Sequence, residues 1–124
     1  MPLISVILPT CDRPELLGRA VASVLAQSDV DFELIVVDNN RGLPPLDPAN
    51  SPFLANPRLR LVRAPDARNA SQARNAGLAA AAGKWISYLD DDDEYAPGKL
   101  SRCLERAQAE NAGLVLCGAE LVLN

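Results

Sequence analysis

The sequence contains no histidine, and only 4% of its 124 residues are aromatic. Its three cysteines, Cys11, Cys103 and Cys117, lie at unrelated spacings and form no CxxC pair. Protein zinc sites rely mainly on cysteine and histidine ligands, and disulfide frameworks need cysteines in even number. The composition therefore argues against a structural zinc site and a disulfide framework, and it predicts an aliphatic, alanine-rich core.

Positive charge and long apolar runs are also scarce. The formal net charge is −4, which does not suit a protein that covers nucleic-acid phosphates. No apolar run reaches the roughly 18 residues needed to cross a bilayer. A strand-like run follows Met1 directly, without the basic and apolar regions of a signal peptide. We therefore expect a cytoplasmic chain with no nucleic-acid partner and no transmembrane segment.

Short apolar segments alternate with helical patterns along the whole chain. Three of them, at residues 4–8, 34–37 and 85–89, are typical of buried strands. Residues 59–62 alternate with arginine and indicate a strand nearer the sheet edge, and a final strand is expected from Gly113 onward. Strands that alternate with helices predict right-handed βαβ units. We expect one domain with a Rossmann-like α/β fold, in which a mostly parallel sheet is the middle of three α/β/α layers.

Three helices are predicted between these strands. Their start signals are Asp12 with Glu15, which have capping-box spacing, and Pro14, then Asn69 or Ser71, and finally Pro97. The second helix has an inner face of alanine and glycine, so it can lie close against the sheet, and it is expected to end at Gly83. The segment from 41 to 57 is rich in proline, asparagine and aspartate and is predicted to be a long loop.

Polar residues gather where three of the predicted strands end. Pro9 to Asp12 follow the first strand, Asp38 to Asn40 follow the second, and Asp90 to Asp93 follow the fourth. Ligands of parallel α/β sheets bind beyond the carboxyl ends of the strands. We therefore expect the three clusters to meet at one edge of the sheet and to form the ligand site.

The four adjacent aspartates, Asp90 to Asp93, repel one another by about 1 kcal/mol per close pair even in water. A hard divalent cation offsets this repulsion, because Mg²⁺ and Mn²⁺ prefer oxygen ligands. Such an ion can also bridge a diphosphate and neutralise a leaving group. Two alternatives stay open: a solvated acidic turn that favours the start of the next helix, and a simple helix-capping role for Asp93.

Other nucleotide-binding motifs are absent or incomplete. No GxGxxG follows the first strand, and Gly83-Lys84 lacks the Ser or Thr of a P-loop because Trp85 stands there. A phospho-acceptor receiver domain is an alternative interpretation, with Asp38 as the acceptor. Such a domain also needs a separate acidic pocket, which makes this alternative less favoured. A nucleotidyltransferase usually has a glycine-rich basic loop after its first strand, which this chain lacks.

Five groups of residues follow one another in the same order as the motifs of a known protein family. They are Ile4–Thr10 with Asp12–Pro14, Val24–Gln27, Phe32–Asp38, Ala73–Gly77 with Ala82-Gly83, and Leu89–Asp93 with Pro97 and Leu100. Together they resemble the inverting family 2 glycosyltransferases of the GT-A type over nearly the whole chain. The resemblance implies transfer of a sugar from a nucleotide-diphospho-sugar to a glycan or other hydroxyl acceptor. It also implies Mn²⁺ or Mg²⁺ as cofactor and a role in polysaccharide or cell-envelope glycan synthesis.

The resemblance also implies site residues. Asp92, together with Asp90, looks like the metal ligand of the DXD-type motif, and Asp90 or Asp91 looks like the partner of the ribose hydroxyls. Asp38 and Asn39 stand where the family reads the base edge. The nucleotide-sugar contacts that it implies are Pro9, Thr10, Asp12, Asp38, Asn39, Arg74, Asp90 and Asp91.

Several of these assignments have plainer alternatives. Pro9 and Thr10 can simply end a strand, and Arg74 can be an ordinary surface residue of a helix. Cys11 stands where the family often has an aromatic residue, and Asn39 stands where it often has an acid. Because an amide offers both donors and an acceptor, the base is left unspecified.

Family members are longer than this chain, and no candidate general base is found in it, with nothing to support Glu120 in that role. We therefore expect residues 1–124 to hold the donor and metal site and to lack the acceptor-binding part. The alternative is a catalytically inactive nucleotide-binding module. The final strand, as a sheet edge, is expected to pair with another copy or to be poorly ordered. Membrane association through the acceptor or through further sequence stays open.

Overall fold

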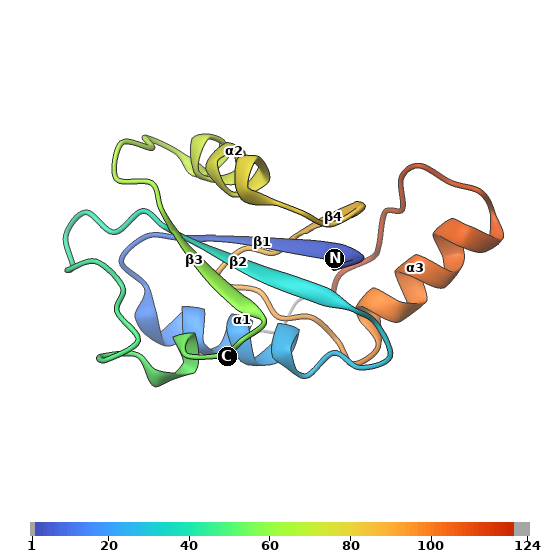
Figure 1. Cartoon of the computed structure of the whole chain (residues 1–124), viewed down its shortest axis with the longest axis horizontal. Helices are drawn as coiled ribbons and strands as arrows, with labels where there is room; N and C mark the ends of the chain where they lie inside the picture. Colours follow the sequence, from blue (N-terminus) through green and yellow to red (C-terminus); the bar gives the residue numbers. More distant parts are fainter. Residues whose placement is uncertain (1, 121–124) are drawn as a thin grey trace.

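A computed structural model describes residues 2–120, and its centre is a four-stranded sheet (Figure 1). Across the sheet the strands are β3 (Leu59–Arg63), β2 (Phe32–Asp38), β1 (Ile4–Thr10) and β4 (Trp85–Tyr88). All three neighbouring pairs are parallel. Met1 and residues 121–124 lie outside the described part of the chain. The mostly parallel α/β sheet is confirmed, and β3 is an edge strand as its arginine alternation predicts. β4 is the other edge strand, and its residues alternate between half-buried and exposed, so the buried strand predicted at 85–89 was wrong in burial.

Helices cover both faces of this sheet (Figure 1). Helix α1 (Pro14–Leu25) joins β1 to β2 and shares a core with Val6 and Leu8 of β1. Helix α2 (Ala70–Ala80) joins β3 to β4 and packs against Ile7, on the opposite face of β1. Every residue of β1 and β2 is buried, as expected for central strands covered on both sides. The three-layer α/β/α arrangement follows from this burial.

The start of α1 differs from the capping-box prediction. Pro14 occupies the first turn as expected, but Arg13 stands at the N-cap and no side chain caps the helix. Asp12 has a positive φ of 54°, and its carboxylate accepts hydrogen bonds from the backbone N–H groups of residues 41–43. The prediction that Asp12 caps this helix was wrong, because three loop N–H groups satisfy its carboxylate better than one helix N–H.

Helix α2 lies close to the sheet, as its small inner face predicts. Asn69 caps the helix and accepts a hydrogen bond from the Gln72 N–H at 2.9 Å. A Cβ atom on Gly77 would lie 2.6 Å from the Ile7 Cγ2 and 2.9 Å from the Val37 Cγ2. Only glycine fits at that distance, so the sequence of α2 sets its separation from the sheet. The helix ends at Ala80, before the predicted stop at Gly83.

A buried carboxylate ties the return from α2 into the sheet. Glu33 of β2 accepts hydrogen bonds from Ser5 Oγ at 2.6 Å, the Ala82 N–H at 2.7 Å and Arg60 Nη1 at 3.0 Å. Burial alone would raise the pKa of Glu33, but these three hydrogen bonds outweigh it and hold the pKa below its ordinary value. The adjacent Gly83 N–H donates to Ser5 Oγ at 2.7 Å. The network fixes where β4 begins.

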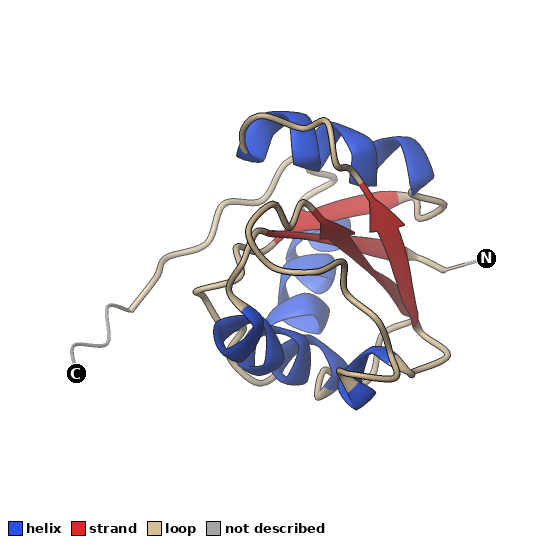
Figure 2. Cartoon of the chain, turned by 90° about the vertical axis from the view of Figure 1, so that its left-hand side faces the viewer, coloured by secondary structure: helices blue, strands red, loops and turns tan. Residues whose placement is uncertain are grey.

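The end of the chain departs most from the sequence prediction. Helix α3 (Lys99–Ala109) begins two residues after Pro97, with Gly98 at its N-cap, and residues 113–120 form no strand (Figure 2). A strand needs a hydrogen-bonded neighbour, and no backbone pairing links this segment to β4 within residues 2–120. The final strand was therefore wrongly predicted for the described residues. The long loop at 41–57 is present and contains the short 3-10 helix η1 (Pro52–Leu54).

None of the helices in the described part of the chain has both the length and the apolar character to span a membrane.

Candidate functional site

The strand order creates a switch point at the carboxyl end of the sheet. From β1 the chain moves outward to β2 and β3, and it then returns to the other side of β1 as β4. A pocket of about 360 Å³ opens at this point. We call it the polar pocket, and its lining is Pro9, Thr10, Cys11, Arg13, Asn39, Arg41, Asn69, Ala70, Ala73, Arg74, Asp90, Asp91 and Asp92. The predicted convergence of three strand-end clusters at one sheet edge is therefore present in the structure.

Asp91 points into the fold and joins two of these clusters. Its side chain is 3% exposed, and its carboxylate accepts a hydrogen bond from Thr10 Oγ1 at 2.9 Å. The Arg13 guanidinium lies 3.2 Å from its other oxygen. Both oxygens of Asp91 are thus occupied by partners from the same chain, and Thr10 connects the end of β1 to the acidic segment after β4.

The other aspartates face outward and form a compact acidic group. Carboxylate oxygens of Asp90, Asp92 and Asp93 all lie within 4.8 Å of one another. Burial and repulsion from its three aspartate neighbours raise the pKa of Asp93. Asp93 does not cap α3, because the N-cap of that helix is Gly98. The capping alternative for Asp93 is therefore wrong.

Two arginines balance the charge of this acidic group. Arg74 of α2 donates a hydrogen bond to Asp90 Oδ1 at 2.6 Å. Arg13 reaches Asp92 at 3.6 Å in addition to its contact with Asp91. The two guanidinium groups therefore approach the acidic group from α2 and from the start of α1, both along the lining of the polar pocket.

The donor set of the acidic group fits a hard divalent cation. All its ligand atoms are carboxylate oxygens, which suit Mg²⁺ and Mn²⁺, and all three residues are exposed. Exposure leaves room for water and phosphate oxygens, which Mg²⁺ commonly keeps among its ligands. The residues present therefore satisfy the chemistry that the predicted metal site requires.

Asn39 carries an unused hydrogen-bond acceptor in the polar pocket. The side chain is only 5% exposed, and its Oδ1 has no hydrogen-bond partner among the described residues. Buried polar atoms are nearly always paired, so a single unpaired atom that lines a pocket marks a place for a ligand donor. The N–H of a planar heterocycle is such a donor.

Asp12 and Asp38 are not part of the pocket lining. The Asp38 carboxylate accepts from the backbone N–H of Asn40 at 2.9 Å and of Leu46 at 2.8 Å. Hydrogen bonds from the Gly42 and Leu43 N–H groups lower the pKa of Asp12. Both carboxylates hold the loop that follows β2, so they shape one wall of the polar pocket from outside.

The structure also adds residues that the sequence did not assign to the site. Arg13, Arg41 and Asn69 line the polar pocket beside the predicted residues. Arg13 directly follows the strand-end cluster that ends at Asp12, and Asn69 was predicted only as the cap of the second helix. Arg41 comes from a loop position whose approach to the sheet no local pattern indicates.

Comparison with protein families gives a match over almost the whole chain. The family described as "Glycosyl transferase family 2" matches residues 5–122. Among curated proteins, the succinoglycan biosynthesis protein ExoO of Rhizobium meliloti (strain 1021) is 34% identical over 122 residues, covering 98% of this chain and 34% of that protein. A GalNAc(5)-diNAcBac-PP-undecaprenol beta-1,3-glucosyltransferase of Campylobacter jejuni is 32% identical over 108 residues, covering 86% of this chain and 35% of that protein.

The fold also has relatives among solved structures. S. aureus TarS 1-349, in complex with UDP-GlcNAc, superposes with a TM-score of 0.71 at 21% identity. The match covers 88% of this chain and 32% of that one. The chain thus spans about a third of the length of these relatives.

Proposed function

The chain belongs to glycosyl transferase family 2, and on that premise we propose that its polar pocket binds a nucleotide-diphospho-sugar together with Mn²⁺ or Mg²⁺. One observation carries the proposal: two members of the acidic group (Asp90 and Asp92), three arginines and an unpaired buried acceptor share one pocket at the switch point of the sheet. Nucleotides bind at this place in open α/β sheets. The UDP-GlcNAc complex of the structural relative agrees with this class of donor.

The pocket offers a distinct place for each part of the donor. Asn39 Oδ1 is ready to accept a hydrogen bond from a ring N–H, which uracil, thymine and guanine all possess. Pro9 and Thr10 form the wall beneath the nucleoside, and Asp91 lies next to them through its bond to Thr10. Arg74, which lines the pocket beside Asp90, supplies a cation for the diphosphate. Asp12 and Asp38 support the base side indirectly, through the loop they hold.

Asp92 and Asp90 would hold the metal, with Asp93 as a third oxygen donor. Bound there, the cation would neutralise charge on the nucleoside-diphosphate leaving group. Arg13 and Arg74 limit the repulsion between the aspartates and so keep the oxygens together. Asp91 is already satisfied by Thr10 and Arg13, so we assign it to positioning the segment and exclude it from the metal ligands.

The full reaction would be inverting transfer of the sugar to a hydroxyl acceptor in glycan synthesis, as the names of the relatives suggest. An inverting displacement needs a general base within hydrogen-bond reach of the acceptor hydroxyl. The carboxylates that line the polar pocket are engaged by Arg13, Arg74 and Thr10. We therefore expect this chain alone to bind the donor without transferring the sugar, and sustained turnover by it would contradict that expectation.

Thermal denaturation with Mn²⁺ and a nucleoside diphosphate tests the binding proposal. At a ligand concentration about 100 times Kd, we expect UDP with Mn²⁺ to raise Tm by at least about 5 °C, with GDP and dTDP measured alongside to define the base. Asp92→Ala should abolish the rise. Asp31→Ala is a matched control, because Asp31 is exposed and precedes β2 at the opposite end of the sheet. An equal rise in Asp92→Ala would overturn the proposal.

A further inference from the structure

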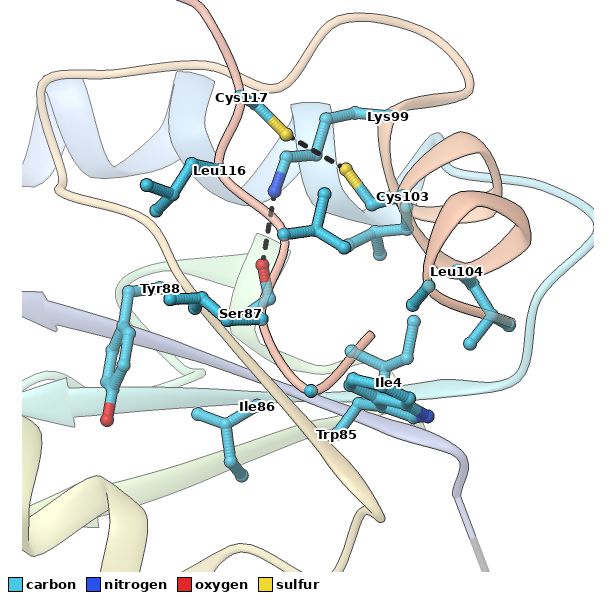
Figure 3. A pocket seen from close by; sticks show the side chains of 15 residues that line it. Ile4, Trp85, Ile86, Ser87, Tyr88, Lys99, Cys103, Leu104, Leu116 and Cys117 are labelled. Carbon is cyan, nitrogen blue, oxygen red and sulfur yellow. Dashed lines mark hydrogen bonds between the residues drawn. The ribbon is translucent and has the colours of Figure 1, made fainter. Parts of the chain in front are cut away.

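A second pocket lies at the outer edge of β4, away from the polar pocket. It also measures about 360 Å³, and it lies between β4, α3 and the segment 113–117. We call it the apolar pocket, and the side chains that characterise it are Ile4, Trp85, Ile86, Leu100, Leu104 and Leu116. Cys103 and Cys117 face each other at its rim (Figure 3). Their sulfur atoms lie 3.0 Å apart.

The geometry of the chain explains why these two cysteines meet. From Glu110 back to Cys103 the helix rises about 10 Å, at about 1.5 Å per residue. The chain turns back after α3, where the Ala112 N–H donates to the Ala107 carbonyl at 2.8 Å. Residues 113–117 then line the same pocket as Cys103, and this brings Cys117 beside Cys103.

The two thiols have complementary surroundings. Cys103 is half-buried on the side of α3 that carries Leu100 and Leu104, whereas Cys117 is exposed. Burial raises the pKa of the Cys103 thiol, the contact with Cys117 raises it further, and the charge of Lys99 opposes the rise. An oxidant in solution therefore meets Cys117 first, and Cys103 stands behind it in position to complete a disulfide.

We propose that Cys103 and Cys117 form a redox-active pair that a low-molecular-weight disulfide, such as glutathione disulfide, converts into an intramolecular disulfide, which fixes the segment 113–117 across the apolar pocket. The inference is independent of the proposed nucleotide site. Disulfides in reducing compartments are commonly transient and redox-sensing, which suits a pair placed at the surface.

The chemistry proceeds in two exchanges. The Cys117 thiolate attacks one sulfur of glutathione disulfide, forms a mixed disulfide and releases one glutathione. The Cys103 thiolate then attacks the Cys117 sulfur and releases the second glutathione. The protein loses two protons and two electrons, and one glutathione disulfide becomes two glutathione molecules.

Peptide mapping of the oxidised chain tests the assignment. The reduced 124-residue chain is incubated with glutathione disulfide at mildly alkaline pH, where the thiolate fraction is larger, and is digested with trypsin without reductant. We expect residues 103–106 joined to residues 107–124, because cleavage after Arg102 and Arg106 separates the two cysteines. The intact chain should be lighter by two hydrogen atoms.

Three serine variants decide between pairing and general reactivity. The Cys11→Ser chain should form the cross-link as fast as the unmodified chain. The Cys103→Ser and Cys117→Ser chains should form no cross-link, and each should retain a glutathione adduct on the cysteine that is left of the pair. Glutathione adducts on the unmodified chain without the cross-link, or a dimer linked through Cys117, would overturn the proposal.

Hydrogen exchange tests the structural consequence. Closing the link should slow amide exchange of residues 114–116 about tenfold relative to the reduced chain, because local opening of the segment would then be restrained. A cross-linked chain with unchanged exchange in this segment would show that the disulfide does not fix it, and would overturn that part of the proposal.

Discussion

The two pockets have the same volume, about 360 Å³, and opposite origins. The polar pocket is assembled from the carboxyl ends of β1, β2 and β4, which are locked in register by the parallel ladder. The apolar pocket has β4 on one side and, on the other, the segment 113–117, which has no strand partner among the described residues. Sheet pairing thus fixes the first site from several directions. At the second, the sulfur contact joins the segment 113–117 to α3, and a hydrogen bond from Lys99 Nζ to Ser87 Oγ at 3.4 Å joins α3 to β4.

This comparison predicts that a substitution beneath the polar pocket destabilises the fold, whereas an equivalent substitution beside the apolar pocket does not. Gly77→Ala places a Cβ 2.6 Å from the Ile7 side chain, so we expect about 2 kcal/mol of destabilisation in urea denaturation, after the helix-propensity gain of alanine. Gly113→Ala is the matched control, because no atom lies within 4 Å of the added methyl group. Equal effects of the two substitutions would break the comparison.

The buried network of Glu33 supports both pockets, since it fixes the start of β4. Glu33→Gln should lower the free energy of unfolding by about 1.5 kcal/mol at neutral pH, because the hydrogen-bond network loses its charged carboxylate. Since the folded-state pKa of Glu33 is lowered, its contribution is fully present above the unfolded pKa of about 4.3 and is lost as the pH falls through the folded-state pKa.

Unfolding measured from neutral to acidic pH checks this sign. The difference in stability between the unmodified chain and Glu33→Gln should shrink as the pH falls below about 4. Glu105→Gln, at an exposed position of α3, should leave the stability unchanged within about 0.5 kcal/mol. A difference that grows on acidification would contradict the assigned role of Glu33.

The smallest effect is expected for Arg13, and it distinguishes the balancing of aspartate charge from ligand binding within the polar pocket. Arg13→Ala removes a cation beside Asp91 and Asp92, so Mn²⁺ alone should bind more tightly. UDP affinity in saturating Mn²⁺ should instead fall by a few-fold, up to about tenfold, because the lining of the pocket loses a positive charge that attracts the anionic nucleotide. Calorimetric titration of the metal and of the nucleotide separates the two. Arg102→Ala, at an exposed position of α3, should change neither affinity.

Much of the fold was predictable because the relevant signals are local. The apolar runs of β1 and β2 indicate strands covered on both sides, and the alanine-glycine face of α2 indicates close packing. The meeting of the strand-end clusters follows from parallel topology, which places every carboxyl end at one edge. Asn39 could thus be assigned to the pocket from its strand-end position, whereas Arg74, on helix α2, was assigned only through the family resemblance.

Long-range competition for hydrogen bonds explains what was missed. Asp12 has the pattern of a helix cap, but the loop at 41–43 offers it three N–H donors that no local window contains. Residues 113–117 have the composition of a strand, but a strand also requires a neighbour at the sheet edge. Arg41 reaches the polar pocket through such a loop, so its place depends on distant contacts too.

The central position of β1 has a consequence for synthesis of the chain. Within the four-stranded sheet, β1 is made before β2 and β3, and its other neighbour β4 follows these two, so the bond from Thr10 to Asp91 joins residues 81 positions apart. At about 5–20 residues per second, the β4 side of β1 stays open for about 4 to 16 seconds during translation. An apolar strand edge is a template for unwanted pairing over that interval. The polar pocket is therefore completed only once β4 has been made, and until then the open edge of β1 can pair wrongly.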